Sequence, residues 1–242
     1  MLAKKKTIAL FLADPYCSVQ SGNGIIKALG DSYNFKIFGK NILEDNFFDD
    51  VDLIVVPGGF GDANSFDRLF QHNITRIQEF IKGSGAYLGI CMGAYWAGQH
   101  YLNILDSVDA VQYITQPNTD TRRPHAKAID INWQGHLDRM FFYDGCALVG
   151  DKNKFNTVAT YANGDAMAIT QGRIGLIGCH LESEKFWYDE YSWMGKHWHN
   201  GAHHKLLSEF VKNYLLVARY VPSQSAGRSL ARISAIRSIH SS

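Results

Sequence analysis

The apolar segment Ala86–Ile90 leads into the motif GICMG at residues 89–93, and helical sequence follows the motif. A continuous apolar run of this length is typical of a strand that is buried on both faces. A cysteine between two glycines at the end of such a strand predicts a sharp strand–turn–helix elbow with Cys91 in the place of a nucleophile. We therefore expect an open α/β sheet whose carboxyl edge carries Cys91.

Strands and helices alternate through the first hundred residues. Apolar runs at residues 7–13, 35–38 and 51–56 predict three more strands, and residues 21–29 and 66–81 have helical spacing. Strands that alternate with helices pair in parallel and are covered on both faces. The sequence therefore predicts a flavodoxin-like three-layer α/β/α sandwich with a mainly parallel central sheet.

The pattern changes between residues 105 and 142, where polar residues and prolines dominate without a clean period. We interpret this stretch as an elaboration on the sheet. Residues 157–161 and 166–170 flank an Asn-Gly turn, which predicts a hairpin. Residues 173–180 predict one more strand, and residues 205–220 predict a closing helix.

The predicted organisation is one domain over residues 1–221 with a flexible or weakly packed tail at 222–242. The formal net charge of +1 gives no argument for nucleic acid, and no apolar run approaches the ~20 residues of a membrane span. Lysines before residues 7–13 resemble a signal peptide, but the short run and missing cleavage site favour a buried strand. Four cysteines without a CxxC pair favour a reducing cytoplasm: Cys17, Cys91, Cys146 and Cys179.

A thiolate nucleophile needs a base, and the base needs a group that orients it. His180 and Glu182 follow the strand predicted at residues 173–180, and strand alternation places both on one face. The N-terminus of the helix after Cys91 would favour the thiolate. Taken alone, a buried inert cysteine and a surface histidine are alternatives. Together with the elbow, the pattern favours a Cys91–His180–Glu182 triad.

Backbone N–H groups near the elbow are candidates for an oxyanion hole. The N–H of Met92 follows the cysteine directly, and Gly58 and Gly59 follow the strand at residues 51–56. Glycines leave their N–H groups uncovered, so this turn can supply a second donor. A plain tight turn is the alternative.

Two other clusters have a functional and a structural interpretation. The histidines of residues 187–204 suggest a metal site, but no carboxylate or cysteine completes a standard spacing. A packed aromatic loop or lid near His180 is favoured there, and we predict no metal and no cofactor. Arg122 and Arg123 suggest anion binding, but such isolated charges favour a solvated loop. The tail arginines are expected to belong to a plain polar tail.

These motifs together resemble a known family. The order of PGG at residues 57–59, GICMGAYWAG at 89–98 and a late strand ending in HLE is similar to class I glutamine-amidotransferase-like domains. Within that superfamily, residues 89–95 resemble the G-x-C-x-G-A-Y elbow of the biotin–protein ligase N-terminal domain family. Residues 143–145 resemble that family's Tyr-Asn-Gly-Gly segment, with Asp144 and Cys146 as departures. The resemblance implies Cys91 as nucleophile, His180 as base and Glu182 as orienter.

Two departures limit what the resemblance implies. Working glutamine amidotransferases usually carry glutamine four residues after the cysteine, and Tyr95 stands there in this chain. The resemblance therefore implies a substrate-binding position for Tyr95 but not glutaminase activity. No GRGRxG-type biotinyl-adenylate loop or Lys-Trp-Pro-Asn segment is found, so a stand-alone domain that does not itself attach biotin is expected.

The leading functional hypothesis is an amidotransferase-like thiol hydrolase that acts on an amide or related acyl group. The alternative is a non-catalytic binding or regulatory module that retains the fold, and a peptidase-type hydrolase is a third possibility. We expect a small-molecule or acyl substrate, no nucleic acid, no membrane and a possible homodimer.

Overall fold

The computed structural model describes residues 4–13, 18–41, 44–60 and 62–216. The predicted domain end at residue 221 and the tail at 222–242 lie outside this described part. Within it, no helix combines the length and the hydropathy that crossing a membrane requires.

A single eleven-stranded sheet runs through the molecule, and its strand order begins β2-β1-β3-β4-β11. All four pairings in this half are parallel. The strands predicted there are confirmed, with these bounds: β1 Thr7–Phe11, β2 Asn34–Phe38, β3 Leu53–Val56, β4 Ala86–Ile90 and β11 Ile174–Ile177.

The other half of the sheet is antiparallel, so parallel pairing is confined to the half that contains Cys91. The predicted hairpin is confirmed as β9 and β10. Residues 105–142, expected to have no regular period, form three strands of this same sheet. The antiparallel half contains β5 Val108–Gln112, β6 Lys127–Trp133, β7 His136–Phe142, β8 Cys146–Gly150, β9 Asn156–Tyr161 and β10 Ala166–Gln171.

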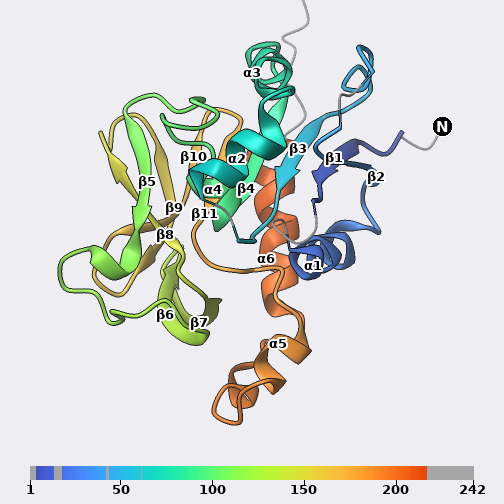
Figure 1. The fold of residues 1–242 in the computed structure, drawn as a ribbon. Helices are drawn as coiled ribbons and strands as arrows, with labels where there is room; N and C mark the ends of the chain where they lie inside the picture. The colour runs from blue at the N-terminus through green and yellow to red at the C-terminus, as the bar shows by residue number, and fades with distance from the viewer. Residues whose placement is uncertain (1–3, 14–17, 42–43, 61, 217–242) are drawn as a thin grey trace, which may run out of the picture.

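Alternate side chains of the parallel strands enter two hydrophobic cores. In β1, Ile8 and Leu10 pack into one core, whereas Ala9 and Phe11 pack into the other. Figure 1 shows the helices that cover the two faces. The first face carries α1 (Val19–Leu29) and α6 (Ala202–Phe210), and the second carries α2 (Ala63–Phe70), α3 (Ile74–Lys82) and α4 (Met92–Tyr95). This is the predicted three-layer arrangement.

Two helix predictions need correction. Residues 66–81 form two helices, because the chain breaks at Asn73, which starts α3 and points its buried side chain at the Asn41 carbonyl. The closing helix begins at Ala202, earlier than predicted, and changes to a π-helix at Val211–Leu215. Two short elements precede it, α5 (Lys185–Asp189) and a 3₁₀ turn at Gly195–His197.

Candidate active site

Cys91 occupies the predicted elbow. It lies between β4 and α4 with φ 48° and ψ −104°, a backbone conformation that residues other than glycine rarely adopt. A Cβ atom on Gly93 would lie 2.0 Å from the carbonyl oxygen of Val56 on β3. Glycine is therefore required at 93 for the chain to turn beside β3. Such strain is retained where the surrounding structure fixes it, and it commonly marks functional sites.

The helix predicted after Cys91 is present but short. α4 covers only Met92–Tyr95, and Trp96 is its C-cap residue. Four residues carry only a small part of a helix macrodipole, so the expected dipole support for a thiolate is weak. Any electrostatic support for charge on the sulfur must therefore come from neighbouring side chains.

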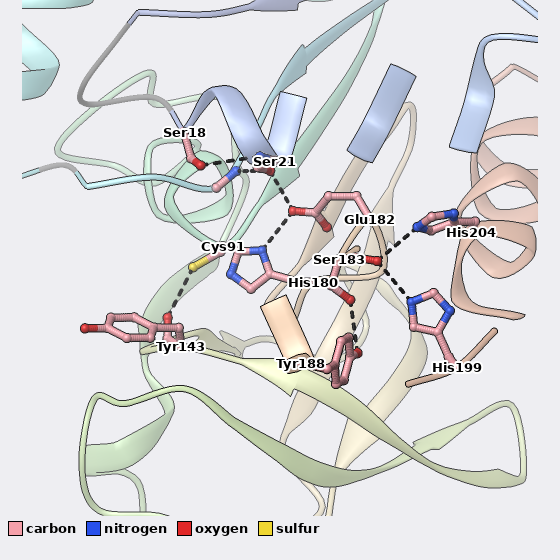
Figure 2. A network of polar contacts seen from close by, with 11 residues as sticks. Ser18, Ser21, Cys91, Tyr143, His180, Glu182, Ser183, Tyr188, His199 and His204 are labelled. Atoms are coloured by element: carbon pink, nitrogen blue, oxygen red, sulfur yellow. Dashed lines mark hydrogen bonds and ion pairs between the residues drawn. The ribbon is translucent and has the colours of Figure 1, made fainter. Parts of the chain in front are cut away.

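His180 supplies that neighbour. Its Nδ1–H donates to Oε1 of Glu182 at 2.8 Å, and both side chains are buried. Strand alternation does not explain this pair, because β11 ends at Ile177 and both residues lie in the loop beyond it. A Cβ atom on Gly58 would lie 2.5 Å from Cε1 of His180 and 3.6 Å from Cβ of Cys91, so the two side chains meet at Gly58. Figure 2 shows the imidazole between the sulfur and the carboxylate.

The charge state of His180 follows from these neighbours. Burial disfavours the imidazolium, but the Glu182 carboxylate and Cys91 outweigh it and raise the pKa of His180 to about 10. The imidazole therefore keeps both protons at neutral pH and places a positive charge beside the sulfur.

Ser21 is a member of this network that the sequence analysis missed. The Ser18 side chain caps α1 and accepts from the N–H of Ser21, which places Ser21 in the first helical turn. The Ser21 hydroxyl is buried and donates to Oε1 of Glu182 at 2.6 Å. Oε1 thus accepts from both Ser21 and His180, which fixes the carboxylate (Figure 2). No local motif marks this serine, because its partner lies 161 residues away.

The predicted oxyanion donors are not equally available. The N–H of Gly58 donates to the Ser21 hydroxyl at 3.1 Å and so does not point freely into the site. Gly59 lines the cavity next to Cys91. Met92 is the first residue of α4, so its N–H has no acceptor one turn earlier in that helix. Met92 and Gly59 therefore remain the candidate donors, whereas the N–H of Gly58 is already paired.

The histidine-rich segment supports the loop that carries His180 and Glu182. The carbonyl of Ser183 accepts from Nε2–H of His199 at 3.1 Å and of His204 at 3.0 Å (Figure 2). The Ser183 hydroxyl contacts the Tyr188 hydroxyl at 3.1 Å. The residue that follows Glu182 is thus anchored from three sides, as expected for a packed loop near His180.

The same histidines have hydrogen-bond partners in place of a metal. Nδ1 of His199 accepts from the N–H groups of Gly201 and His203 at 3.1 and 3.3 Å. Burial lowers the pKa of His199 to about 3, so this ring stays neutral. His203 donates through Nε2–H to Asp138 at 2.9 Å. In the described part of the chain, no three His, Cys, Asp or Glu side chains gather as metal ligands would.

Other residues named from the sequence lie around the site. The hydroxyl of Tyr95 donates to the Asp144 carbonyl at 3.2 Å, and Tyr95 is not among the residues that line the cavity at Cys91. The Tyr143 carbonyl lies 3.7 Å from the sulfur of Cys91. Arg122 donates to the Gln116 carbonyl and is exposed, as expected of a solvated loop.

Cys91 opens into a cavity of about 370 Å³. Cys146 and Cys179, by contrast, are fully buried free thiols, and burial raises the pKa of both well above the usual thiol range. Cys91 is therefore the one of the described cysteines that lines a cavity, with the buried His180 beside it and room for a ligand above it.

Comparison with solved structures gives the class of fold. The chain resembles a glutamine amidotransferase with 15% identity and a TM-score of 0.55 over 72% of this chain and 90% of that chain. A glutamine amidotransferase from Thermotoga maritima has 14% identity and a TM-score of 0.57 over 87% and 92%. PurLQS from the same organism has 14% identity and a TM-score of 0.59 over 86% and 100%. The fold is flavodoxin-like and of the class I glutamine-amidotransferase kind, as predicted.

A comparison with protein families gives a match to part of the chain. Residues 17–105 match the family described as Biotin-protein ligase, N terminal. The match contains the Gly58–Gly59 turn and the Cys91 elbow, and it confirms the resemblance predicted from the elbow motif. No curated protein matches the chain by sequence.

Proposed function

We propose that the chain is an amidotransferase-like thiol hydrolase that cleaves an amide or related acyl group. The observation that carries the proposal is the buried hydrogen bond between His180 and Glu182 next to a strained Cys91 that lines a cavity. This arrangement has the three parts of a nucleophile–base–orienter unit.

In the proposed reaction, the Cys91 thiolate adds to the carbonyl carbon of the substrate. The Met92 N–H donates to the oxyanion that forms, an interaction typically worth about 3 kcal/mol of barrier. His180 gives its Nε2 proton to the leaving amine, and the carbon–nitrogen bond breaks to leave a thioester. His180 then takes a proton from water, the resulting hydroxide attacks the thioester, and acid and thiolate are released. Glu182 keeps the imidazole in one orientation throughout.

The thiol reactivity of the native protein tests this proposal. Cys91 should be alkylated by iodoacetamide near pH 6–7 much faster than a reference thiol of pKa about 8.5. Changing His180→Ala should reduce this rate to that of the reference thiol, because the cation beside the sulfur is lost. Peptide mapping by mass spectrometry identifies the modified residue, and Cys91→Ala gives the background.

A native Cys91 that reacts no faster than the reference thiol at any pH would sink the hydrolase proposal. The chain would then be better described as a binding or regulatory module that retains the amidotransferase fold.

A further inference from the structure

The cavity above Cys91 has an unusually aromatic wall. Phe141 and Trp187 pack edge-on against the His180 ring, with ring centroids 5.9 and 5.3 Å away. Both belong to a small hydrophobic cluster that is separate from the two cores of the sheet. One side of the cavity is thus formed by residues of an aromatic cluster that is separate from the two cores.

The mouth of the cavity exposes more aromatic surface to solvent. Phe60, Tyr143 and Phe186 line it with 70%, 43% and 48% of their surface exposed. They are three of seven large hydrophobic residues exposed in the described part of the chain. Exposed apolar side chains that gather around one opening, rather than scatter singly, mark a binding site.

The charges around the cavity exclude one class of ligand. Among the described residues, no lysine or arginine lines it. Glu190 lines the rim with an exposed carboxylate, and His180 is already paired with Glu182. An anionic group at the rim would therefore meet the Glu190 carboxylate and aromatic faces, which repel it. The polar lining residues Ser18, Gln20 and Ser21 carry no positive charge, and the charge of His180 is paired with Glu182.

We propose that this cavity selects acyl substrates whose non-reacting part is aromatic or apolar and carries no negative charge. The proposal rests on the proposed thiol chemistry of Cys91 and adds a specificity to it. Phe60 and Phe186 bind the aromatic part, and Glu190 repels anions. Free glutamine, whose carboxylate would lie near Glu190 with no lysine or arginine among the described lining residues, is not a substrate.

A matched series of alkylating reagents tests this specificity. All carry the same iodoacetamide group. The first is iodoacetamide itself, and the other three add a benzyl group, a trimethylammonium group or a carboxylate at the end remote from the iodine. Rates at Cys91 are divided by the rates of the same reagents with N-acetylcysteine. The benzyl reagent should gain about tenfold over iodoacetamide, and the carboxylate reagent should lose about tenfold; each factor corresponds to roughly 1.4 kcal/mol. The cationic reagent should be at least as fast as iodoacetamide.

Variants assign these preferences to the cavity. Phe60→Ala and Phe186→Ala should reduce the benzyl gain to about threefold or less, and Glu190→Gln should remove most of the loss with the carboxylate reagent. Trp193→Ala and Glu209→Gln are matched controls, because both residues are exposed and neither lines the cavity. These two variants should keep both preferences.

The outcomes separate the two proposals. Equal normalised rates for all reagents at a fast-reacting Cys91 would overturn the specificity and leave the thiol hydrolase intact. A preference that Trp193→Ala abolishes as strongly as Phe186→Ala would also overturn it, because the aromatic effect would then lie outside the cavity. A Cys91 that reacts slowly with every reagent contradicts the proposed function itself.

Discussion

At the scale of single residues, the site depends on one carboxylate oxygen that two donors share. Oε1 of Glu182 accepts from His180 at 2.8 Å and from Ser21 at 2.6 Å. The Ser21 hydroxyl also accepts from the N–H of Gly58. Ser21 thus connects the orienter of the proposed triad to the glycine turn against which Cys91 and His180 pack. We infer that Ser21 is a positioning residue.

Replacing Ser21→Ala tests this role. The change removes a hydrogen bond to a carboxylate and leaves the buried N–H of Gly58 without its acceptor, so the free energy of unfolding should fall by about 1–3 kcal/mol. The rate of Cys91 alkylation at pH 7 should fall about tenfold, because the carboxylate and the imidazole lose one fixed contact. Urea denaturation and peptide mapping measure the two effects.

Ser65→Ala is the matched control for this change. Ser65 is also a buried serine whose hydroxyl donates to a carboxylate, at Asp62, but it lies on α2. Its loss should affect stability alone. Equal alkylation rates in both variants would mean that Ser21 is merely structural.

The residue scale also separates what sequence reasoning reaches from what it misses. Cys91 was recognisable because its glycines and apolar strand are adjacent in the chain, and His180 and Glu182 because they are two residues apart. Ser21 was not, because a serine in a helical first turn is also an ordinary capping residue. Only the fold brings α1 to Glu182.

At the scale of elements, the elbow depends on close packing between β3 and the turn after Cys91. A side chain at 93 would overlap the Val56 carbonyl, and backbone cannot move as the end of a flexible side chain can. Hydrogen bonds hold the same turn: the N–H of Cys91 donates to the Ile177 carbonyl at 2.8 Å, and the Tyr87 hydroxyl donates to the Gly93 carbonyl at 2.7 Å.

Gly93→Ala should therefore destabilise the protein by roughly 3 kcal/mol, the upper range for an overpacked core position. Gly195→Ala is the control, because the nearest atom to a Cβ there lies 3.8 Å away. It should change the free energy of unfolding by no more than about 0.5 kcal/mol. Wild-type stability of the Gly93→Ala protein would contradict the close contact between β3 and the elbow.

The elements that sequence reasoning missed share a physical cause. β6 and β7 pair with each other over seven residues, yet the first four side chains of β7 are exposed and three of them are polar, so β7 lacks a clean apolar run. α2 and α3 bury the same side of the chain at Phe66, Phe70 and Ile77, so the helical period continues across the break at Asn73. Hydrophobic periodicity reports which side is buried, and it does not report where hydrogen bonding stops.

At the scale of the whole molecule, the fold joins the loop that carries His180 and Glu182 to the closing helix through the neutral ring of His199. His199 donates to the Ser183 carbonyl and accepts from two N–H groups at the start of α6. If the ring took up a second proton, this proton would sit on Nδ1, which could then no longer accept either hydrogen bond. The neutral state of this ring is therefore a condition for the packing of residues 183–204.

This dependence predicts a specific loss of stability in acid. The pKa of His199 is about 3 in the folded chain and about 6.5 for an ordinary histidine, so both states are neutral above pH 6.5. As the pH falls below 6.5, the unfolded chain binds a proton that the folded chain does not. The free energy of unfolding should therefore decrease steadily, by up to about 2 kcal/mol between pH 6.5 and 5. Burial lowers the pKa of His203 as well, which adds to the same trend.

His199→Asn should be less stable than the wild type at pH 7 but should lose less stability between pH 6.5 and 5, because asparagine does not titrate. Urea midpoints at half-unit pH steps measure the slope, and His100→Asn, at an exposed position, controls for a lost histidine. Identical slopes in His199→Asn and the wild type would show that another group causes the acid sensitivity. Because Ser183 follows Glu182, Cys91 alkylation should decline over the same pH range and recover when the pH is restored.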